Sequence, residues 1–515
     1  MDKALDITNL KKIVKIATKL FEPLKNYFLS PYSVIPILSQ VLGLNTPLLG
    51  TGSSPYSIFF IAIDLAKEKS LLKEAFEIPF SQKRIIVDEI YDVIAPFLLG
   101  EEKNYIHFLI TTRYKGYNKS KIKERVEIIK EFLSIFPMDN LGDFAHIAHY
   151  GYEEDLNREN AFIRNFSQRE KEAWFRDSYP IVNELVLRNK RFEIKGWIIL
   201  VANSTDQLLR DKELRKRKIF QAAKLANVLG AKIVGMGGLI ASFAEGGYYL
   251  TERFKDVGFT TGHAYTIGNL LQNAERVSNK VGLILTKAIV GIVGAAGSIG
   301  SGCAKLFVDK GIRRLILVET TGFAIKRKLE ILIKELREIK KDVDLFISDD
   351  LNDIKRADLV IVATNSPFSI IKSKYLKEGA IVIDDSFPKN VSKNILEQRK
   401  DIILLEGGAV TLPLYTDIDI ARNMPDLMDA PLTRLISCKE VYGCFAEVLT
   451  LAISGHRGNY GLGVANPKLA RDIINKANKL GFQPAPFQCF DHGIEEDRFR
   501  IVRRIIKRRI DRELF

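Results

Sequence analysis

The most regular pattern of hydrophobic and polar positions lies between residues 286 and 410. Short, fully apolar runs alternate there with amphipathic stretches or turns. The runs are KAIVGIV, RLILV, VDLFI, DLVIVAT, GAIVIDD and DIILLEGG. Strands that are apolar on both faces and alternate with helices are typical of a parallel sheet covered by helices on both sides. We therefore predict a doubly wound α/β domain over 286–410.

The pattern outside this range is less regular. Residues 1–140 show apolar positions three and four apart, as in 10–20 and 122–136, which predicts a mostly helical N-terminal extension of unknown role. Residues 141–285 mix both patterns: strands at 194–202 and 231–241 flank an amphipathic helix at 214–230. We interpret this range as a mixed α/β substrate domain.

After residue 411 the pattern predicts a helical C-terminal region, 411–515. One helical stretch, 437–455, contains two cysteines. The end of the chain, RFRIVRRIIKRRIDRELF, is a basic amphipathic helix. Its basic face is interpreted either as a solvated surface or as a contact for an acidic carrier or a membrane surface.

Composition narrows the class of protein. Of 515 residues, 46% are hydrophobic and 27% charged, which excludes disorder for most of the chain. The net charge of +14 favours acidic partners, such as nucleic acid, anionic lipid or an acidic carrier protein, without choosing among them. Four cysteines are too few for a disulfide framework. With no signal-peptide pattern and no spanning apolar run, we expect a cytoplasmic protein.

One region is compatible with membrane association. No residue between Lys25 and Asp64 is charged, and prolines and glycines interrupt the run. A continuous helix is excluded by these breakers. The segment is interpreted in one of two ways. It is either buried in the protein core, or it is a monotopic membrane-contacting loop or a cover for a hydrophobic substrate.

The first strand of the regular region runs into a glycine turn. The strand 288–293 leads into a G-x-x-G-x-x-G sequence and then an amphipathic helix. Glycines permit a tight turn and let a pyrophosphate approach the backbone, while the helix start supplies N–H groups. This pattern predicts a Rossmann domain that binds NADH or NADPH, although a turn that merely packs helix on strand fits too. The predicted cofactor-binding residues here are Gly294, Ala295, Gly297, Ser298, Ile299 and Gly300.

Two further groups are expected near the dinucleotide. Glu319 ends the second strand, where an acid can bind a ribose 2′-OH and repel a 2′-phosphate, so NADH is slightly favoured. The basic run 326–328 lies beyond it and is the alternative partner of a 2′-phosphate. Thr364, Asn365 and Ser366 follow the fourth strand, at the sheet edge where ligands bind. They are interpreted as nicotinamide-pocket residues or as a simple polar turn.

The cysteines do not form a metal-binding pattern. Cys438 and Cys444 are six residues apart, on different faces of a helix, and no Cys/His zinc spacing or H-E-x-x-H is present, so no metal is expected. Spacing alone makes each of the four cysteines more typical of a small buried hydrophobe than of a nucleophile.

Several segments, in order, resemble the long-chain acyl-[acyl-carrier-protein] reductases, the fatty-aldehyde-forming enzymes, over about residues 143–486. The most informative is GCFAEVLTLAISGHRGNYGLG (443–463). The others are FAHIAHYGYEED, GAKIVGMGGLIASFAE, FTTGHAYTIGNLLQNAE, VGAAGSIGSGCAKLF, IVIDDSFPKN, LLEGGAV and GFQPAP. In that family the cysteine of the CFAE segment accepts the acyl group, and here it is Cys444.

The resemblance implies a reaction. A thiolate attacks the acyl thioester of acyl carrier protein or CoA, and the enzyme-bound thioester is reduced by NAD(P)H to a fatty aldehyde. His149, His263 and Glu447 are the candidate activating or orienting groups, and Glu447 lies one helical turn from Cys444. A carboxylate this close raises a thiol pKa, which favours orientation as its role. The implied partners include no nucleic acid.

The chain differs from the family in three places. Where the family has T-T-G-N-x-H-T, this chain has T-T-G-H-A-Y-T, so that His263 replaces the asparagine and Tyr265 the histidine. Glu319 stands in the region of the family's basic residue, which suits NADPH. The stretch 411–431 is longer than usual.

Two other functions fit part of the pattern. A shikimate- or glutamyl-tRNA-reductase-like dehydrogenase would share the glycine turn and the strands but would not need Cys444. A non-enzymatic dinucleotide- or lipid-binding module would have Cys444 merely packed.

Overall fold

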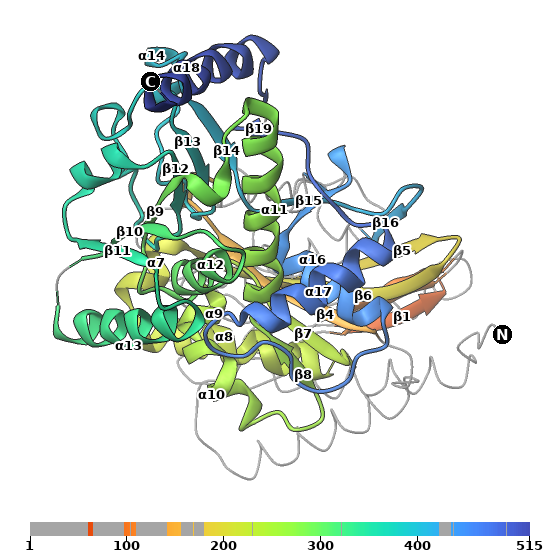
Figure 1. The fold of residues 1–515 in the computed structure, drawn as a ribbon. Helices are drawn as coiled ribbons and strands as arrows, with labels where there is room; N and C mark the ends of the chain where they lie inside the picture. Colours follow the sequence, from red (N-terminus) through yellow and green to blue (C-terminus); the bar gives the residue numbers. More distant parts are fainter. Residues whose placement is uncertain are drawn as a thin grey trace. The chain divides into compact units, whose positions relative to one another are not determined.

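The computed structural model describes residues 60–64, 97–102, 105–109, 142–155, 168, 172, 180–228, 230–320, 322–421, 434–435, 437–490 and 492–514 (Figure 1). The expected helices at 10–20 and 122–136 and most of the charge-free run lie outside these residues. Contacts divide the chain into two compact units. The first comprises Met1–Lys232 and Asp417–Asp429, and the second comprises Ile233–Thr416 and Ala430–Phe515. The four predicted domain ranges stay a prediction.

The first unit is built on strands from distant parts of its sequence. The antiparallel hairpin β5–β6 pairs with β16 on one side, and β4 runs parallel to β6 on the other. The bounds are β4 Phe144–Tyr150, β5 Ile181–Asn189, β6 Phe192–Ser204, β16 Asp417–Ala421, α7 Thr205–Arg210 and α8 Lys212–Val228. The expected strand at 194–202 and helix at 214–230 are therefore present.

A second sheet of this unit differs from the expectation. Strands β1 (Phe60–Asp64), β3 (Tyr105–Leu109) and β2 (Phe97–Glu102) form an antiparallel sheet in that order. The helical prediction for 1–140 is thus wrong at these residues, because strand pairing there overrides a weak local pattern.

The second unit contains the predicted parallel sheet. Its six strands run in the order β11-β10-β9-β12-β13-β14, and every pairing is parallel. The bounds are β9 Ile289–Val293, β10 Arg314–Val318, β11 Asp344–Ser348, β12 Leu359–Val362, β13 Ile381–Asp384 and β14 Ile403–Glu406. The doubly wound α/β prediction is confirmed. The strand order reverses between β9 and β12, and ligands of such sheets bind at that carboxyl edge.

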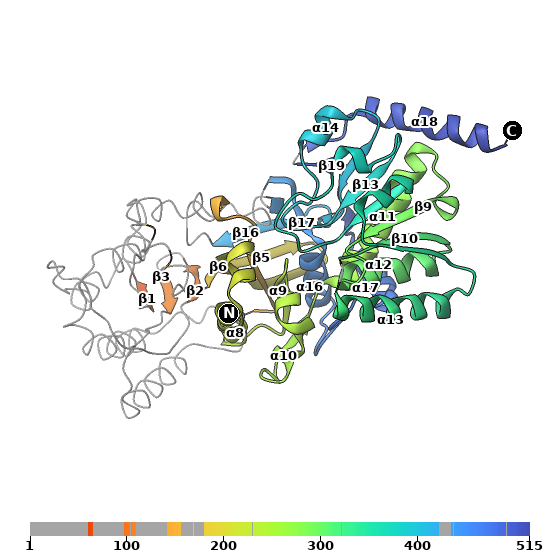
Figure 2. The ribbon, with the colours of Figure 1, turned by 90° about the vertical axis from the view of Figure 1, so that its left-hand side faces the viewer.

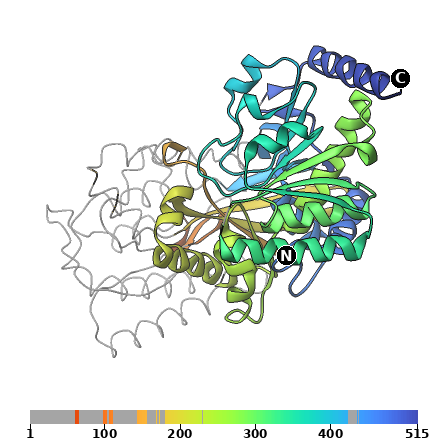
Figure 3. The same ribbon diagram turned by 60° about the vertical axis from the view of Figure 1, so that its left-hand side comes forward.

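Helices and short turns cover both faces of this sheet. One face packs against α11 (His263–Val281), α12 (Ser298–Asp309), α13 (Phe323–Ile339) and α18 (Glu496–Leu514) in a single apolar core. Figures 2 and 3 show α12 and α13, in green, along this face. The other face packs against the turns Leu351–Arg356 and Ser373–Tyr375 and against α14 (Asn394–Gln398). Burial on both faces explains why β9, β12, β13 and β14 are almost entirely apolar, whereas the edge strand β11 is largely exposed.

This unit also contains further short helices, strands and turns. They are β7 Ile233–Met236, α9 Ile240–Phe243, Glu245–Gly247, α10 Tyr248–Thr251, β8 Gly258–Thr260, Leu285–Lys287, β15 Ala409–Thr411, β17 Glu440–Tyr442, α16 Gly443–Ile453, α17 Pro467–Leu480, β18 Gln483–Pro484, β19 Gln488–Cys489 and β20 His492–Gly493. Strands β7 and β8 are parallel, and β15 pairs antiparallel with β17 and β18. In the described part of the chain, no helix has the length and apolar character needed to span a membrane.

The C-terminal region differs from the expectation at one important point. The helix predicted for 437–455 begins only at Gly443, because Glu440–Tyr442 pair with Ala409–Thr411 as a strand. Cys444 therefore lies in the first turn of α16 rather than in the middle of a helix. Cys438 precedes the strand and is exposed.

The basic helix α18 is anchored by an apolar face. Phe499, Val502 and Ile506 are buried in the core of the parallel sheet, and the Phe499 ring lies 5.5 Å from that of Phe487. We expect Phe499→Ala to lower the free energy of unfolding by about 3–5 kcal/mol. The midpoint of urea unfolding should fall accordingly, while Arg508→Ala on the exposed face should change stability by no more than about 0.5 kcal/mol. Equal midpoints for the two variants would show that α18 does not stabilise the sheet.

Candidate active site

Cys444 lies where two helix starts meet. It is in the first turn of α16, and its backbone and Cβ pack directly on Gly262, which precedes α11. Gly262 has φ +74°, and a Cβ there would overlap Cys444. Glycine is thus required at this position by both backbone conformation and space.

The thiol is poorly ionised in this environment. Burial raises the pKa of Cys444 to about 12, and the nearby Asp385 and Glu447 carboxylates add to the rise. Backbone hydrogen bonds from Gly238 and Phe445 act in the opposite direction. The helix start also favours a thiolate. Cys444 as a whole residue is only partly buried.

Glu447 lies one turn further along α16 and is completely buried. Its carboxylate accepts hydrogen bonds from the Thr260 hydroxyl and from the Tyr265 backbone N–H, the latter at 2.6 Å. Burial raises the pKa of Glu447 to about 7, although hydrogen bonds from this turn oppose the shift. Its carboxylate therefore caps the start of α11, where unpaired N–H groups favour an acceptor.

His263 is the first residue of α11. Its Nδ1 lies 3.0 Å from the carbonyl oxygen of Gly463, which can only accept, so Nδ1 carries the proton. Burial lowers the pKa of His263 to about 4, and the ring is neutral at pH 7. The neighbouring Thr261 hydroxyl donates to the Gly461 carbonyl at 2.5 Å. The structure thus brings His263, Glu447 and Cys444 together around one turn.

His149 belongs to the first unit. It is the next-to-last residue of β4, is buried, and has Nδ1 2.9 Å from the carbonyl oxygen of Tyr150. Burial lowers the pKa of His149 to about 4. Its assignment to the catalytic group stays a prediction.

The glycine turn has the geometry that a dinucleotide needs. Gly294 has φ +84°, and a Cβ at Gly294 or Gly300 would overlap backbone atoms of the turn or of Ala363. Gly297 is different, because a Cβ there would lie 3.1 Å from the Gly294 carbonyl oxygen and 3.8 Å from that of Ala363, without overlap. Ala295 is buried, while Ser298 and Ile299 are partly exposed at the start of α12. A bare backbone at a helix start fits a pyrophosphate.

Glu319 lies beside this turn. One carboxylate oxygen accepts from the Ala296 N–H at 2.9 Å, and the other accepts from the Thr320 N–H at 3.0 Å. The basic residues Lys326, Arg327 and Lys328 are all exposed on α13.

The loop after β12 is held by hydrogen bonds. The Ser366 N–H donates to the Thr364 hydroxyl at 3.1 Å, and Asn390 donates to the carbonyl oxygens of Ser366 and Phe368. Asn365 is exposed on the same loop. The loop is thus an ordered polar turn at the carboxyl edge of the sheet.

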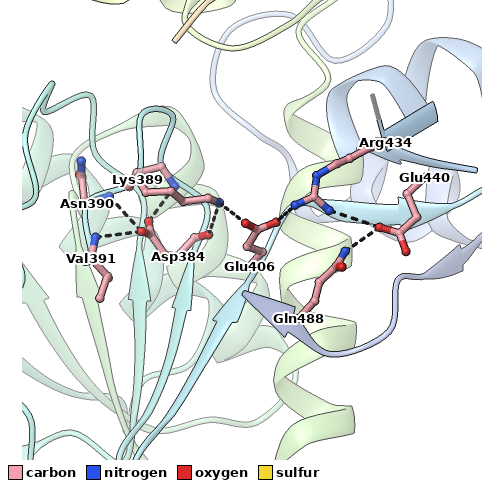
Figure 4. Close-up of polar contacts among 9 residues, drawn as sticks. Asp384, Lys389, Asn390, Val391, Glu406, Arg434, Glu440 and Gln488 are labelled. Carbon is pink, nitrogen blue, oxygen red and sulfur yellow. Dashed lines mark hydrogen bonds and ion pairs between the residues drawn. The ribbon is translucent and has the colours of Figure 1, made fainter. Parts of the chain in front are cut away.

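A chain of buried charges that sequence reasoning missed lies at the same edge (Figure 4). Asp384 accepts from the N–H groups of Asn390 and Val391, and the ammonium of Lys389 lies 3.8 Å from Glu406. The chain continues from Glu406 to Arg434, and from Arg434 to Glu440 at 3.3 Å. Two adjacent acids ending an apolar strand were the only sequence signal of this arrangement.

The sequence of the chain is similar to those of several known proteins. Residues 275–404 match the family model of shikimate / quinate 5-dehydrogenases. A long-chain acyl-[acyl-carrier-protein] reductase from Synechococcus elongatus is 24% identical over 355 residues, which are 67% of this chain and 98% of that protein. The resemblance to that family is confirmed. The second unit holds an NAD(P)-binding Rossmann domain, and the matched proteins support an oxidoreductase.

Two other matches are more limited. The aminotransferase PigE from a Serratia species is 25% identical over 367 residues, which are 69% of this chain. The match covers only 41% of the length of PigE. The quinate dehydrogenase from Corynebacterium glutamicum in complex with NAD has 12% identity and a TM-score of 0.32, over 65% of this chain and 99% of that one.

The glycine turn makes a test of cofactor contact possible. We expect Gly297→Val to lower the affinity for NADH and NADPH at least tenfold, because its side chain would stand where the pyrophosphate approaches. Calorimetric titration measures the affinity, and circular dichroism checks that the variant folds. Gly493→Ala is the control, since a Cβ there meets nothing within 4 Å. Unchanged affinity in Gly297→Val would mean that the turn only packs helix on strand.

Proposed function

We propose that the chain reduces a long-chain acyl thioester, carried by acyl carrier protein or CoA, to a fatty aldehyde through a thioester on Cys444. The observation that carries the proposal is the position of Cys444, which is partly exposed in the first turn of α16, packs on Gly262 and lies beside the Glu447-capped turn.

The proposed reaction begins with exchange between two thioesters. The Cys444 sulfur attacks the acyl carbon, its proton is taken up, and the carrier leaves as a thiol after receiving a proton. The N–H groups of Gly238 and Phe445 favour the sulfur in its ionised form. Exchange of one thioester for another is close to thermoneutral. A hydroxyl nucleophile would instead form an oxygen ester, and the exchange would not be thermoneutral.

Reduction follows on the acylated enzyme. Reduced nicotinamide, when bound by the Gly294–Gly300 turn and Glu319, supplies the hydride to the acyl carbon. The sulfur of Cys444 is then expelled as a thiolate and the aldehyde is released. Glu447 and His263 hold the β8–α11 turn against Cys444 throughout, because their contacts with Tyr265 and Gly463 fix its backbone.

A shikimate-like dehydrogenase is the second candidate, and the family match favours it for the dinucleotide domain. That match ends at residue 404, before the segment that carries Cys444 and Glu447. It therefore supports the cofactor half of both candidates and does not bear on the cysteine. Oxidation of shikimate or quinate with NAD⁺ or NADP⁺, unaffected by loss of Cys444, would support this candidate instead.

The first prediction concerns the covalent step. Incubation with palmitoyl-CoA and no cofactor should add one acyl group to Cys444, as found by mass spectrometry of peptides. Cys444→Ala should form no adduct and should lower aldehyde production by on the order of 10³-fold or more. Its affinity for NADH should remain. Cys438→Ala, at an exposed cysteine, is the matched control and should behave as the wild type. More than a tenth of the wild-type turnover in Cys444→Ala would exclude the mechanism.

The second prediction concerns the cofactor. We propose that Glu319 accepts hydrogen bonds from the ribose diol and disfavours a 2′-phosphate, by roughly 1–3 kcal/mol or about 5- to 150-fold. NADH should thus be used at least as well as NADPH, and Glu319→Ala should shift the ratio of kcat/KM toward NADPH. Lys326→Ala, at an exposed position, should leave the ratio unchanged. A wild-type preference for NADPH above tenfold that survives Glu319→Ala would contradict this assignment.

A further inference from the structure

Asp385 is a second carboxylate at the site, and the sequence did not single it out. It follows β13, and its N–H donates to the Val362 carbonyl at 2.9 Å, which fixes it at the carboxyl edge of the sheet. Asp384 accepts from the loop 386–391 on one side. Successive side chains of an extended chain point in opposite directions, so Asp385 faces away from that loop.

The side chain of Asp385 points toward the cysteine segment. A Cβ on Gly408 would lie 2.8 Å from Asp385 Oδ1, so the carboxylate rests on the bare Gly408 backbone. The carbonyl of that same glycine accepts from the Gly443 N–H at 2.8 Å. Asp385 is thus one glycine away from the residue that precedes Cys444, and its charge acts on the Cys444 thiol.

The ionisation of Asp385 suits exchange of protons near neutral pH. Burial raises the pKa of Asp385 to about 7; Asp384 adds to the rise and the Lys389 ammonium opposes it. Among the described residues, the thiols of Cys303 and Cys444 also interact with the charge of Asp385, which raises the pKa of both. A group with this pKa both accepts and gives up a proton readily at pH 7.

The other candidates for this role are engaged differently. Both carboxylate oxygens of Glu447 accept hydrogen bonds from the start of α11, and the side chain is fully buried. The Nδ1 proton of His263 is held by Gly463, and its low pKa makes the ring a weak base. Asp385 is partly exposed, beside the edge where the dinucleotide binds.

We propose that Asp385 is the acid–base group of the thioester exchange, an inference that rests on the proposed function. It takes the proton of the Cys444 thiol as the sulfur bonds to the acyl carbon. It gives that proton to the carrier sulfur as the old carbon–sulfur bond breaks. After aldehyde release it passes a proton from water to the Cys444 thiolate. One proton from solvent is consumed in each turnover, together with the hydride.

Two rates in Asp385→Asn separate this role from a purely electrostatic one. The substitution removes a negative charge near Cys444, so alkylation of the thiol by iodoacetamide at pH 8 should become faster, by about two- to tenfold. Cofactor-free acylation of Cys444 by palmitoyl-CoA at pH 7 should become slower, by about 10²-fold or more, because the base is lost. A carboxylate that only repels the thiolate would accelerate both reactions when removed. Acylation that is unchanged or faster would overturn the inference.

Two further variants serve as controls for the rates measured with Asp385→Asn. Asp349→Asn removes an exposed carboxylate on another loop and should change neither rate. Asp385→Glu should restore part of the acylation rate, and in the wild type this rate should rise with pH through a value near 7, as Asp385 ionises. If Asp385→Asn fails to fold, the pH profile of the wild type still tests the inference. A profile without this rise would overturn it. Absence of any acyl adduct on the wild type would instead refute the proposed function itself.

Discussion

The candidate site depends on the hydrogen bonds that the buried carboxylate of Glu447 accepts. Burying a carboxylate costs several kcal/mol unless donors surround it. Here the donors are the Thr260 hydroxyl and the backbone of the turn that opens α11, including the Tyr265 N–H. Because Glu447 lies one turn below Cys444 on α16, the same bonds hold the thiol against Gly262. The start of α11 and the start of α16 are therefore positioned by one interaction.

The dinucleotide-binding sheet is joined to this centre by charged groups in its own unit. Lys389 lies in the loop after β13, and Glu406 is the last residue of β14. Arg434 connects Glu406 to Glu440, the first residue of β17. Removing one member of such a chain leaves an unpaired buried charge, which costs far more than the pairs contribute. The chain thus specifies how the strand that leads into Cys444 meets the carboxyl edge of the parallel sheet.

Local pattern predicted the parallel sheet well, because strands buried on both faces are apolar at every position and the glycine turn has a strict spacing. The start of α16 was missed because strand pairing of Glu440–Tyr442 with residues 409–411 is a long-range contact that no local pattern contains. Cys444 came from family resemblance, Glu447 was proposed because it lies one helical turn from Cys444, and His263 was one of the candidate activating groups. Their proximity could not be derived, since the Thr260–Glu447 hydrogen bond joins residues 187 apart. Asp385 was one of two adjacent acids, and only the fold shows that the two face opposite sides.

The proposed mechanism requires that an acyl group on Cys444 is an intermediate rather than a side product. The most direct test isolates the acylated enzyme, free of CoA and carrier, and mixes it with NADH in a rapid-quench experiment. This mechanism predicts that one equivalent of aldehyde appears as the adduct disappears, at a rate no slower than steady-state turnover. An acylated enzyme that stays intact with NADH, or loses its acyl group only by hydrolysis, would contradict it.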